Sequence, residues 1–218
     1  MKALLIAGGM IDVQWAGEFI KMHSYDKIIA VDGGLSAANL LGLVPDMIVG
    51  DFDSVEKGLL EKSVANEGCE VIRLNPEKDD TDTQCAVNKT IAIGADEIHI
   101  LGGTGGRIDH MLSNIFMLKM AYEKGVRAVM YDRVNKISVI QGKTSIEKDE
   151  QYGRYISFIQ LEGPVKDVTL EGFKYGLDHF DIDTSKEYRL AVSNEFDKET
   201  ATVDMSEGML IMIEISGD

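Results

Sequence analysis

The sequence predicts an α/β domain with a mostly parallel sheet, followed by an all-β sandwich domain. Up to about residue 132, short apolar runs alternate with segments of helical periodicity, which is typical of βαβ units. After about residue 133, period-two alternation and glycine-rich turns replace the helical pattern, which favours a sandwich or small barrel. No Pro- or Ser-rich linker separates the two patterns. We therefore expect an α/β domain at 1–133, packed closely against a β-sandwich at 134–218.

The elements of the first domain follow from this alternation. A glycine stands just past four of the helical segments, where a left-handed cap is favoured. The last helix is predicted to have one apolar face made of Ile108, Met111, Leu112, Ile115 and Tyr122. Strands are expected at 3–7, 27–31, 46–49, 70–74, 97–101 and 127–131. Helices are expected at about 12–23, 34–42, 54–67, 81–93 and 108–124.

The second domain is expected to contain strands throughout. In the final strand, alternation predicts one face lined by Met209, Ile211, Ile213 and Ile215. The other strand segments are expected at 137–141, 155–161, 165–171, 173–177, 188–192 and 200–205.

Composition and charge exclude several classes of function. The 218 residues carry a formal net charge of -15 and no run of Lys or Arg, so neither nucleic acid nor a membrane surface is an expected partner. No segment reaches the roughly 18 apolar residues of a membrane span. The two cysteines, Cys69 and Cys85, have no metal-like spacing, and we expect a cytoplasmic protein. An acidic protein can still bind an anion such as ATP if it supplies a metal ion and backbone N–H groups.

Two aspartates directly follow a short apolar strand, in the stretch Gly50-Asp51-Phe52-Asp53-Ser54. In open α/β sheets, ligands bind beyond the carboxyl ends of the strands. Carboxylates at i and i+2 can converge there on one hard cation, which prefers oxygen ligands. Alternatively, Asp51 is a turn residue, and Asp53 or Ser54 caps the next helix.

A second acidic cluster, Asp79, Asp80 and Asp82, stands at the start of the helix expected at 81–93. Acidic residues there complement the helix dipole, but three aspartates in four positions exceed what a cap requires. If they gather with Asp51 and Asp53, each pair of charges at 4 Å repels by roughly 4 kcal/mol at an effective dielectric near 20. Such a cluster needs a cation or raised pKa values, and Mg²⁺ is the hard cation of phosphate chemistry.

Two glycine-rich turns follow other predicted strands. Asp32-Gly33-Gly34 opens a helix, where an anion can face the helix N–H groups; an ordinary βα turn capped by Asp32 is the alternative. The loop 102–106 holds four glycines around Thr104 and can form an anion nest, although it lacks the Walker A ending. Arg107 could hold a phosphate, and Asp109 and His110 could orient Arg107 or a ligand. A flexible loop is the alternative.

These stretches, in this order, resemble the thiamine pyrophosphokinase family. The resemblance covers essentially the full length and also includes Ser193-Asn194-Glu195, a stretch that alone would be interpreted as a turn. It implies transfer of the pyrophosphoryl group of ATP to the hydroxyl of thiamine, with Mg²⁺, leaving AMP. It also implies a homodimer, with each active site between the α/β domain of one chain and the β domain of the other. The rival hypotheses are another ATP-dependent small-alcohol transferase and a non-catalytic thiamine- or nucleotide-binding module.

The resemblance also implies residue roles. The α/β domain at 1–133 would bind ATP and Mg²⁺, and the β-sandwich at 134–218 would bind thiamine and the second subunit. Some family members place a tryptophan of the β domain against thiamine, whereas Trp15 is the only tryptophan here. The implied metal ligands are Asp51, Asp53, Asp79 and Asp82, with the choice between Asp79 and Asp80 open. The implied catalytic residues are Asp51, Asp53, Asp82 (a candidate proton acceptor) and Arg107. The implied ATP contacts are Asp32, Gly33, Gly34, Gly103, Thr104, Gly105, Gly106, Arg107, Asp109 and His110. The implied substrate contacts are Gln84, Ser193 and Asn194.

Overall fold

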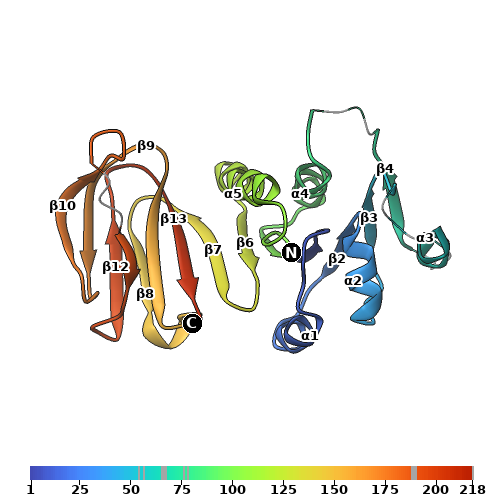
Figure 1. Ribbon diagram of the computed structural model, residues 1–218, viewed down its shortest axis with the longest axis horizontal. Coiled ribbons are helices and arrows are strands. Elements are labelled where there is room, and N and C mark those ends of the chain that lie inside the picture. The colour runs from blue at the N-terminus through green and yellow to red at the C-terminus, as the bar shows by residue number, and fades with distance from the viewer. Residues whose placement is uncertain are drawn as a thin grey trace. The chain divides into compact units, whose positions relative to one another are not determined.

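The chain divides into two compact units, Met1–Arg133 and Val134–Asp218 (Figure 1). This computed structural model describes residues 1–53, 55, 57–64, 68–75, 77, 79–187 and 191–217, apart from the side chains of residues 57 and 64. The first unit alternates strands and helices, and the second consists of strands and one short 3-10 helix. A mixed α/β chain is thereby confirmed. Within the described ranges, no helix is both long and apolar enough to cross a membrane.

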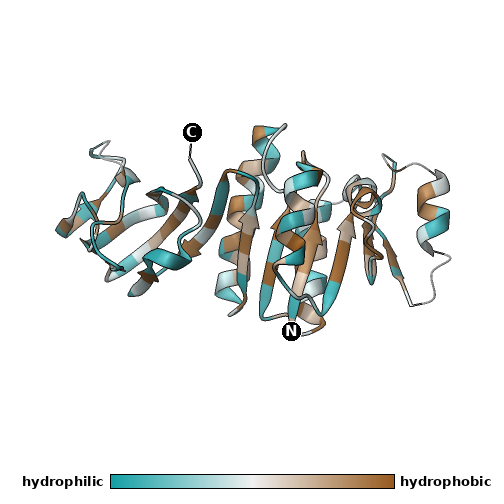
Figure 2. Cartoon of the chain, turned by 90° about the horizontal axis from the view of Figure 1, so that it is seen from below, coloured by the Kyte–Doolittle hydropathy of each residue, from teal (hydrophilic) through white to brown (hydrophobic). Residues whose placement is uncertain are grey.

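The first unit is built on a parallel sheet with the strand order β4-β3-β2-β1-β5-β6. Its central strands are nearly continuous apolar runs, as the brown strands of Figure 2 show, because helices cover both faces. Leu4, Leu5 and Ile6 of β1 are all 0% exposed. The strands are β1 (Lys2–Ile6), β2 (Lys27–Val31), β3 (Met47–Gly50), β4 (Glu70–Arg73), β5 (Glu97–Leu101) and β6 (Arg127–Tyr131).

The helices of the first unit divide between the two faces of its sheet, with α1 and α2 on one face and α4 and α5 on the other (Figure 1). Two of them begin at side-chain caps, where Asp12 accepts a hydrogen bond from the Trp15 N–H and Thr81 from the Gln84 N–H. Helix α3 lies within the predicted segment 54–67, whose residues 54, 56 and 65–67 lie outside the described residues. The helices are α1 (Val13–Lys21), α2 (Gly34–Leu40), α3 (Lys57–Val64), α4 (Asp82–Ala92) and α5 (Ile108–Glu123).

The predicted apolar face of α5 is wrong. Ile108 is 69% exposed, Leu112 50% and Tyr122 37%. The buried residues of this helix are Asn114, Ile115, Met117, Leu118 and Ala121. The helix is apolar on two sides, so helical spacing alone does not identify the side that packs on the sheet.

The second unit pairs its strands antiparallel throughout the described residues, with β9 at the centre. The first half of β9 pairs with β13 and β11, and its second half pairs with β10 and β12. β9 thus takes part in two sheets, and one buried apolar cluster includes residues of both. The strands are β7 (Asn135–Ile140), β8 (Thr144–Glu147), β9 (Tyr155–Glu171), β10 (Leu177–Ile182), β11 (Ala191–Asn194), β12 (Thr200–Asp204) and β13 (Glu207–Ile215).

Three details of this unit differ from the sequence prediction. The predicted strands 155–161 and 165–171 form one strand, β9, that runs through Gly163 and Pro164. Residues 173–176 of the predicted strand 173–177 form no strand, since Phe173 makes only an isolated bridge to Phe196, and Leu177 begins β10. Strand β8 and the rest of β10 were not predicted. In β13, Leu210 and Met212 join the buried cluster, whereas Met209 and Ile211 are also buried; both sides of the strand are therefore apolar. Residues 188–190 of the predicted strand 188–192 lie outside the described residues.

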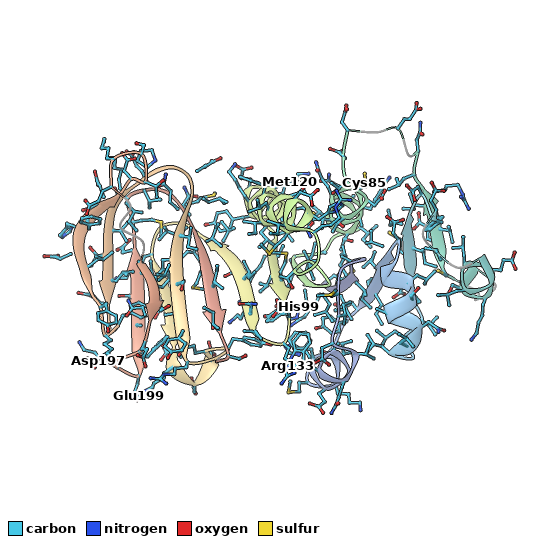
Figure 3. The ribbon with its side chains drawn as sticks, viewed as in Figure 1. Cys85, His99, Met120, Arg133, Asp197 and Glu199 are labelled. Atoms are coloured by element: carbon cyan, nitrogen blue, oxygen red, sulfur yellow. The ribbon has the colours of Figure 1, made fainter. Side chains whose placement is uncertain are left out.

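A buried polar network lies at His99, in the middle of β5 (Figure 3). The ring is 2% exposed. Its Nδ1 lies 2.9 Å from the Tyr25 hydroxyl, and its Nε2 lies 2.9 Å from a carboxylate oxygen of Glu97. Burial lowers the pKa of His99 to about 4, and the positive charge of Lys2 adds to this effect. The imidazole is therefore neutral at physiological pH.

Candidate active site

The point where the sheet order changes direction lies between β1 and β5. From β1 the chain proceeds to β2, β3 and β4 on one side, and then returns to β5 on the other. The helices that follow β1 and β5, α1 and α5, lie on opposite faces of the sheet (Figure 1), and this is the position where open α/β sheets bind ligands. A cavity of about 430 Å³ lies there. Its lining comprises Ala7, Gly8, Gly9, Met10, Val31, Asp32, Gly33, Thr81, Asp82, Thr83, Gly102, Gly103, Gly105, Gly106, Arg107, His110 and Asn114.

Glycines allow the loops around this cavity to approach closely. The Gly9 N–H donates to the Gly102 carbonyl at 3.1 Å, and a Cβ on Gly9 would lie only 2.3 Å from that oxygen. A Cβ on Gly34 would lie 2.0 Å from the Ile6 carbonyl oxygen. Gly34 is therefore a packing residue at the start of α2, while Gly33 lines the cavity. Gly8, Gly9 and the adjacent Met10 were not predicted as site residues, although a glycine pair directly after the first strand was the available signal.

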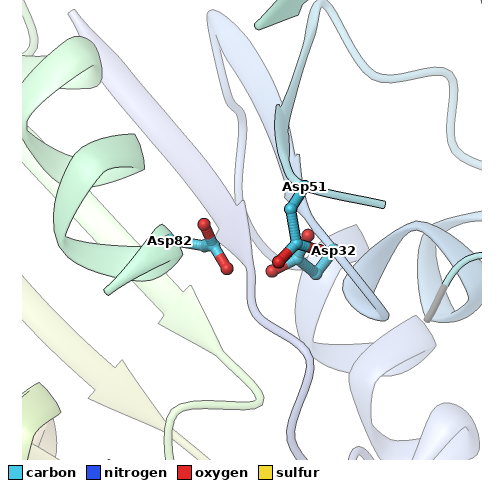
Figure 4. Close-up of side chains that lie close together, drawn as sticks. All are labelled: Asp32, Asp51 and Asp82. Atoms are coloured by element: carbon cyan, nitrogen blue, oxygen red, sulfur yellow. The ribbon is translucent and has the colours of Figure 1, made fainter. Parts of the chain in front are cut away.

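Three carboxylates from three elements lie close together (Figure 4), and two of them, Asp32 and Asp82, line the cavity. Asp32 follows β2, Asp51 follows β3 and Asp82 begins α4. One oxygen from each lies within 4.8 Å of the other two. Burial raises the pKa of Asp32 to about 7, and a hydrogen bond and the charge of Asp82 add to the rise. Three carboxylate oxygens that converge in this way fit a hard divalent cation such as Mg²⁺, which prefers oxygen ligands.

The other aspartates of the two acidic stretches lie outside this group of three. Asp53 is exposed, and its N–H donates to Asp51 Oδ1 at 3.0 Å in an Asx turn. Asp79 is also exposed. The Asp80 carboxylate accepts a hydrogen bond from Gln84 Nε2 at 2.7 Å. Gln84 is not among the residues that line the cavity. Ser54 and Lys78 lie outside the described residues.

The glycine-rich loop after β5 is fixed by two side chains. The Thr104 hydroxyl donates to Asp132 at 2.7 Å, and the buried amide of Asn114 donates to the Gly103 carbonyl at 2.8 Å. Gly105 and Gly106 adopt positive φ values of 79° and 68°, which favour glycine. Asn114 also lines the cavity; it was not predicted, because a lone asparagine inside a helical pattern gives no sequence signal.

Arg107 and Asp109 form a two-point ion pair at the cavity rim. Arg107 Nε and Nη2 donate to the two Asp109 oxygens at 3.2 and 2.5 Å. The guanidinium holds the pKa of Asp109 at about 2. Because the Arg107 side chain is 72% exposed, its remaining donors can reach an anion in the cavity, which Arg107 and His110 both line.

A separate pocket of about 200 Å³ lies in the second unit. Asn194 is 2% exposed, and its amide accepts from the Tyr175 N–H at 3.0 Å and donates to the Tyr175 carbonyl at 2.8 Å. Asn194 thus shapes the wall that carries Tyr175, whose side chain is 59% exposed. Ser193 is exposed, adopts φ 55° and is not part of the lining. The lining comprises Tyr175, Gly176, Leu177, Phe180, Ile182, Ala191, Val192 and Asn194.

The fold and the cavity define an α/β protein with a polar ligand site at the carboxyl ends of its parallel strands. Residues 21–130 match the family described as "Thiamin pyrophosphokinase, catalytic domain", and residues 143–210 match "Thiamin pyrophosphokinase, vitamin B1 binding domain". The chain belongs to the thiamine pyrophosphokinase family, and it is an enzyme of this family. The family's known reaction is the ATP-dependent transfer of a pyrophosphoryl group to thiamine.

Relatives support this membership over nearly the whole chain. Thiamine pyrophosphokinase of Bacillus subtilis is 36% identical over 189 residues, which are 85% of each chain. A crystal structure of the B. subtilis enzyme covers 100% of both chains, with a TM-score of 0.86 and 30% identity. A second crystal structure, of the enzyme from Geobacillus thermodenitrificans, has a TM-score of 0.83 and 29% identity, and the match covers 100% of this chain and 98% of the other.

Proposed function

We propose that the pyrophosphoryl transfer takes place at the cavity of the first unit, with Mg²⁺ held by Asp32, Asp51 and Asp82. The observation that carries this proposal is the meeting of three carboxylate oxygens within 4.8 Å, beside a glycine-lined cavity. Of the four ligands expected from the sequence, this set of three keeps Asp51 and Asp82, leaves out Asp53 and Asp79, and adds Asp32. Bound Mg²⁺ would neutralise the charge of the phosphates and polarise the transferred group.

The chain's own residues would position the polyphosphate. The backbone of the loops after β1 and β5 faces the cavity, and its N–H groups can hold phosphate oxygens. Arg107, fixed by Asp109, can neutralise charge on the transferred group or on the leaving AMP. The thiamine hydroxyl oxygen forms a bond to the β-phosphorus while the bond between that phosphorus and the α,β-bridging oxygen breaks. An aspartate, for which we favour Asp82, accepts the hydroxyl proton.

We place thiamine in the pocket of the second unit. Tyr175, Leu177 and Phe180 supply aromatic and apolar surface there, and an exposed tyrosine face attracts a cationic ring such as thiazolium. Tyr175 thus offers an aromatic group in the unit that lacks a tryptophan. Asn194 acts on this pocket through the backbone of Tyr175.

We also propose a homodimer, which brings the two pockets together by pairing the first unit of one chain with the second unit of the other. Ile108, Leu112 and Phe116 of α5 recur every four residues and are 69%, 50% and 54% exposed. They form an apolar stripe on one side of the helix, and we propose that this stripe is part of the subunit interface, because exposed apolar patches occur at such interfaces. In the described part of the chain, Cys69 and Cys85 form no disulfide, which accords with the cytoplasmic location that we propose and that cell fractionation would check.

The experiment follows the release of AMP by the purified protein with ATP, Mg²⁺ and thiamine. In a second measurement, electron paramagnetic resonance reports the binding of Mn²⁺ to the same protein. Asp51→Asn is expected to lose most activity and to weaken Mn²⁺ binding, while Asp197→Asn, an exposed aspartate of the second unit, changes neither. Tyr175→Ala is expected to raise KM for thiamine at unchanged KM for ATP, and Tyr175→Phe retains the ring and the affinity. Release of ADP instead of AMP would contradict pyrophosphoryl transfer. Unchanged Mn²⁺ binding by Asp51→Asn would contradict the metal site.

A further inference from the structure

The position of the Asp51 carboxylate depends on the backbone turn at Asp51 and Phe52, which has an unusual conformation. Phe52, the next residue, adopts φ 68°, a left-handed conformation that side chains other than glycine rarely adopt. Its N–H points to Asp32 Oδ1 at 3.4 Å. The same turn therefore sets the position of Asp51 directly and contacts Asp32, so it touches two of the three converging carboxylates. A conformation of this kind persists only where neighbouring groups enforce it.

Arg73 is the side chain that holds this turn from outside. It is the last residue of β4 and pairs in register with Gly50, so its side chain starts beside the end of β3. Arg73 Nη1 donates to the main-chain carbonyl of Asp51 at 3.3 Å. The guanidinium carbon lies 5.1 Å from the centre of the Phe52 ring, a cation–π distance. One planar group thus contacts both residues of the turn.

The choice of atoms matters for metal binding. Arg73 bonds the carbonyl of Asp51 and not its carboxylate, so the carboxylate oxygens stay available to a cation. A guanidinium paired with the carboxylate itself would instead compete with the metal. Arg73 is also exposed, and it lies outside the lining of the nucleotide cavity. Its contacts are those of a group that orients a ligand residue.

We propose that Arg73 is a positioning residue for the metal site: it clamps the Asp51–Phe52 turn and thereby fixes the approach of Asp51 to the cation. This inference rests on the proposed function, since it requires a metal at Asp32, Asp51 and Asp82. It assigns to the edge strand β4 a part in the reaction, although β4 supplies no metal ligand.

The test compares Arg73→Gln with Arg127→Gln. Arg127 is also exposed, and its Nη1 lies 3.4 Å from a carboxylate oxygen of Glu97. Each of the two variants therefore removes one positive charge from an exposed arginine. Mn²⁺ binding is measured by electron paramagnetic resonance without nucleotide, alongside the Mg²⁺ dependence of AMP release. Arg73→Gln is expected to weaken Mn²⁺ binding about 10- to 100-fold, the usual loss on removing a residue that orients a metal ligand, and to raise the Mg²⁺ requirement in parallel. KM for thiamine and the melting temperature are expected to stay unchanged, and Arg127→Gln to match the unmodified protein.

Arg73→Lys separates position from charge. Lysine keeps the charge but not the planar fork, so we expect it to remain impaired, and full recovery by lysine would overturn a positioning role. A raised KM for ATP at saturating Mg²⁺, with unchanged Mn²⁺ binding, would also overturn it, since Arg73 would then bind the nucleotide. If Asp51→Asn weakens Mn²⁺ binding and Arg73→Gln does not, the positioning role alone fails. If neither variant changes Mn²⁺ binding, the metal site fails and the positioning role fails with it.

Discussion

Gly50→Ala offers a measure of how closely the position of Asp32 controls the reaction. Gly50 ends β3 without a positive φ, so alanine can adopt its backbone conformation. The added Cβ, however, would lie 1.8 Å from Asp32 Oδ1 and 2.7 Å from Asp32 Cγ. Real contacts of this kind are at least 3.0 Å, so the carboxylate oxygen must move by about 1.2 Å. That movement displaces Asp32 from the group of three and from the Phe52 N–H.

A shift of about 1 Å in a positioned group costs about 100-fold in rate, equivalent to about 2.7 kcal/mol at 1.36 kcal/mol per factor of ten. We therefore expect Gly50→Ala to lower kcat/KM for AMP formation about 100-fold. The fold is expected to remain, because the clash is with the end of a side chain. Gly58→Ala in α3 is the matched control: a Cβ there meets nothing within 4 Å, and alanine favours a helix by about 1 kcal/mol over glycine. A fully active Gly50→Ala enzyme would show that the position of Asp32 does not control the reaction.

Two further predictions concern stability and assembly. Because burial lowers the pKa of His99 to about 4, the folded protein binds fewer protons than the unfolded chain below about pH 6.5, so this group's contribution is complete above pH 6.5 and decreases as the pH falls toward 4. Protonation of His99 should lower the free energy of unfolding by about 3 kcal/mol over this range. The total drop should therefore be smaller in His99→Gln than in the unmodified protein, and unchanged in the exposed-histidine control His110→Gln. Equal drops in the unmodified protein and both variants would refute this assignment. Phe116→Glu, which places a charge in the apolar stripe of α5, should convert a dimer to a monomer in light scattering, whereas Glu123→Gln on the same helix should leave it dimeric; a Phe116→Glu dimer would exclude this stripe from the interface.

Sequence patterns identified most elements of the first unit because its buried strands and helices differ in length and period. Where both faces of an element are apolar, as in α5 and β13, the pattern could not select the face that packs in the core. The long strand β9 was divided at Gly163 and Pro164, because these residues usually end a strand; here Gly163 adopts φ 54° within a strand that takes part in two sheets. The sequence indicated the two acidic stretches but not which aspartates converge, since convergence depends on strand order.

Each residue of the stretch Gly50-Asp51-Phe52-Asp53 has its own part in arranging the carboxylates. Gly50 leaves space for the Asp32 carboxylate, Asp51 contributes an oxygen to the group of three, and the Asp53 N–H holds Asp51 Oδ1. Phe52 is 7% exposed, and its buried ring anchors a left-handed backbone that costs about 1–3 kcal/mol. Two of the five non-glycine residues with positive φ in the described chain, Asp32 and Phe52, thus lie at the converging carboxylates. Both left-handed residues and the three carboxylates therefore lie in one small region, and this concentration of backbone strain and acidic groups accords with the metal site that we propose there.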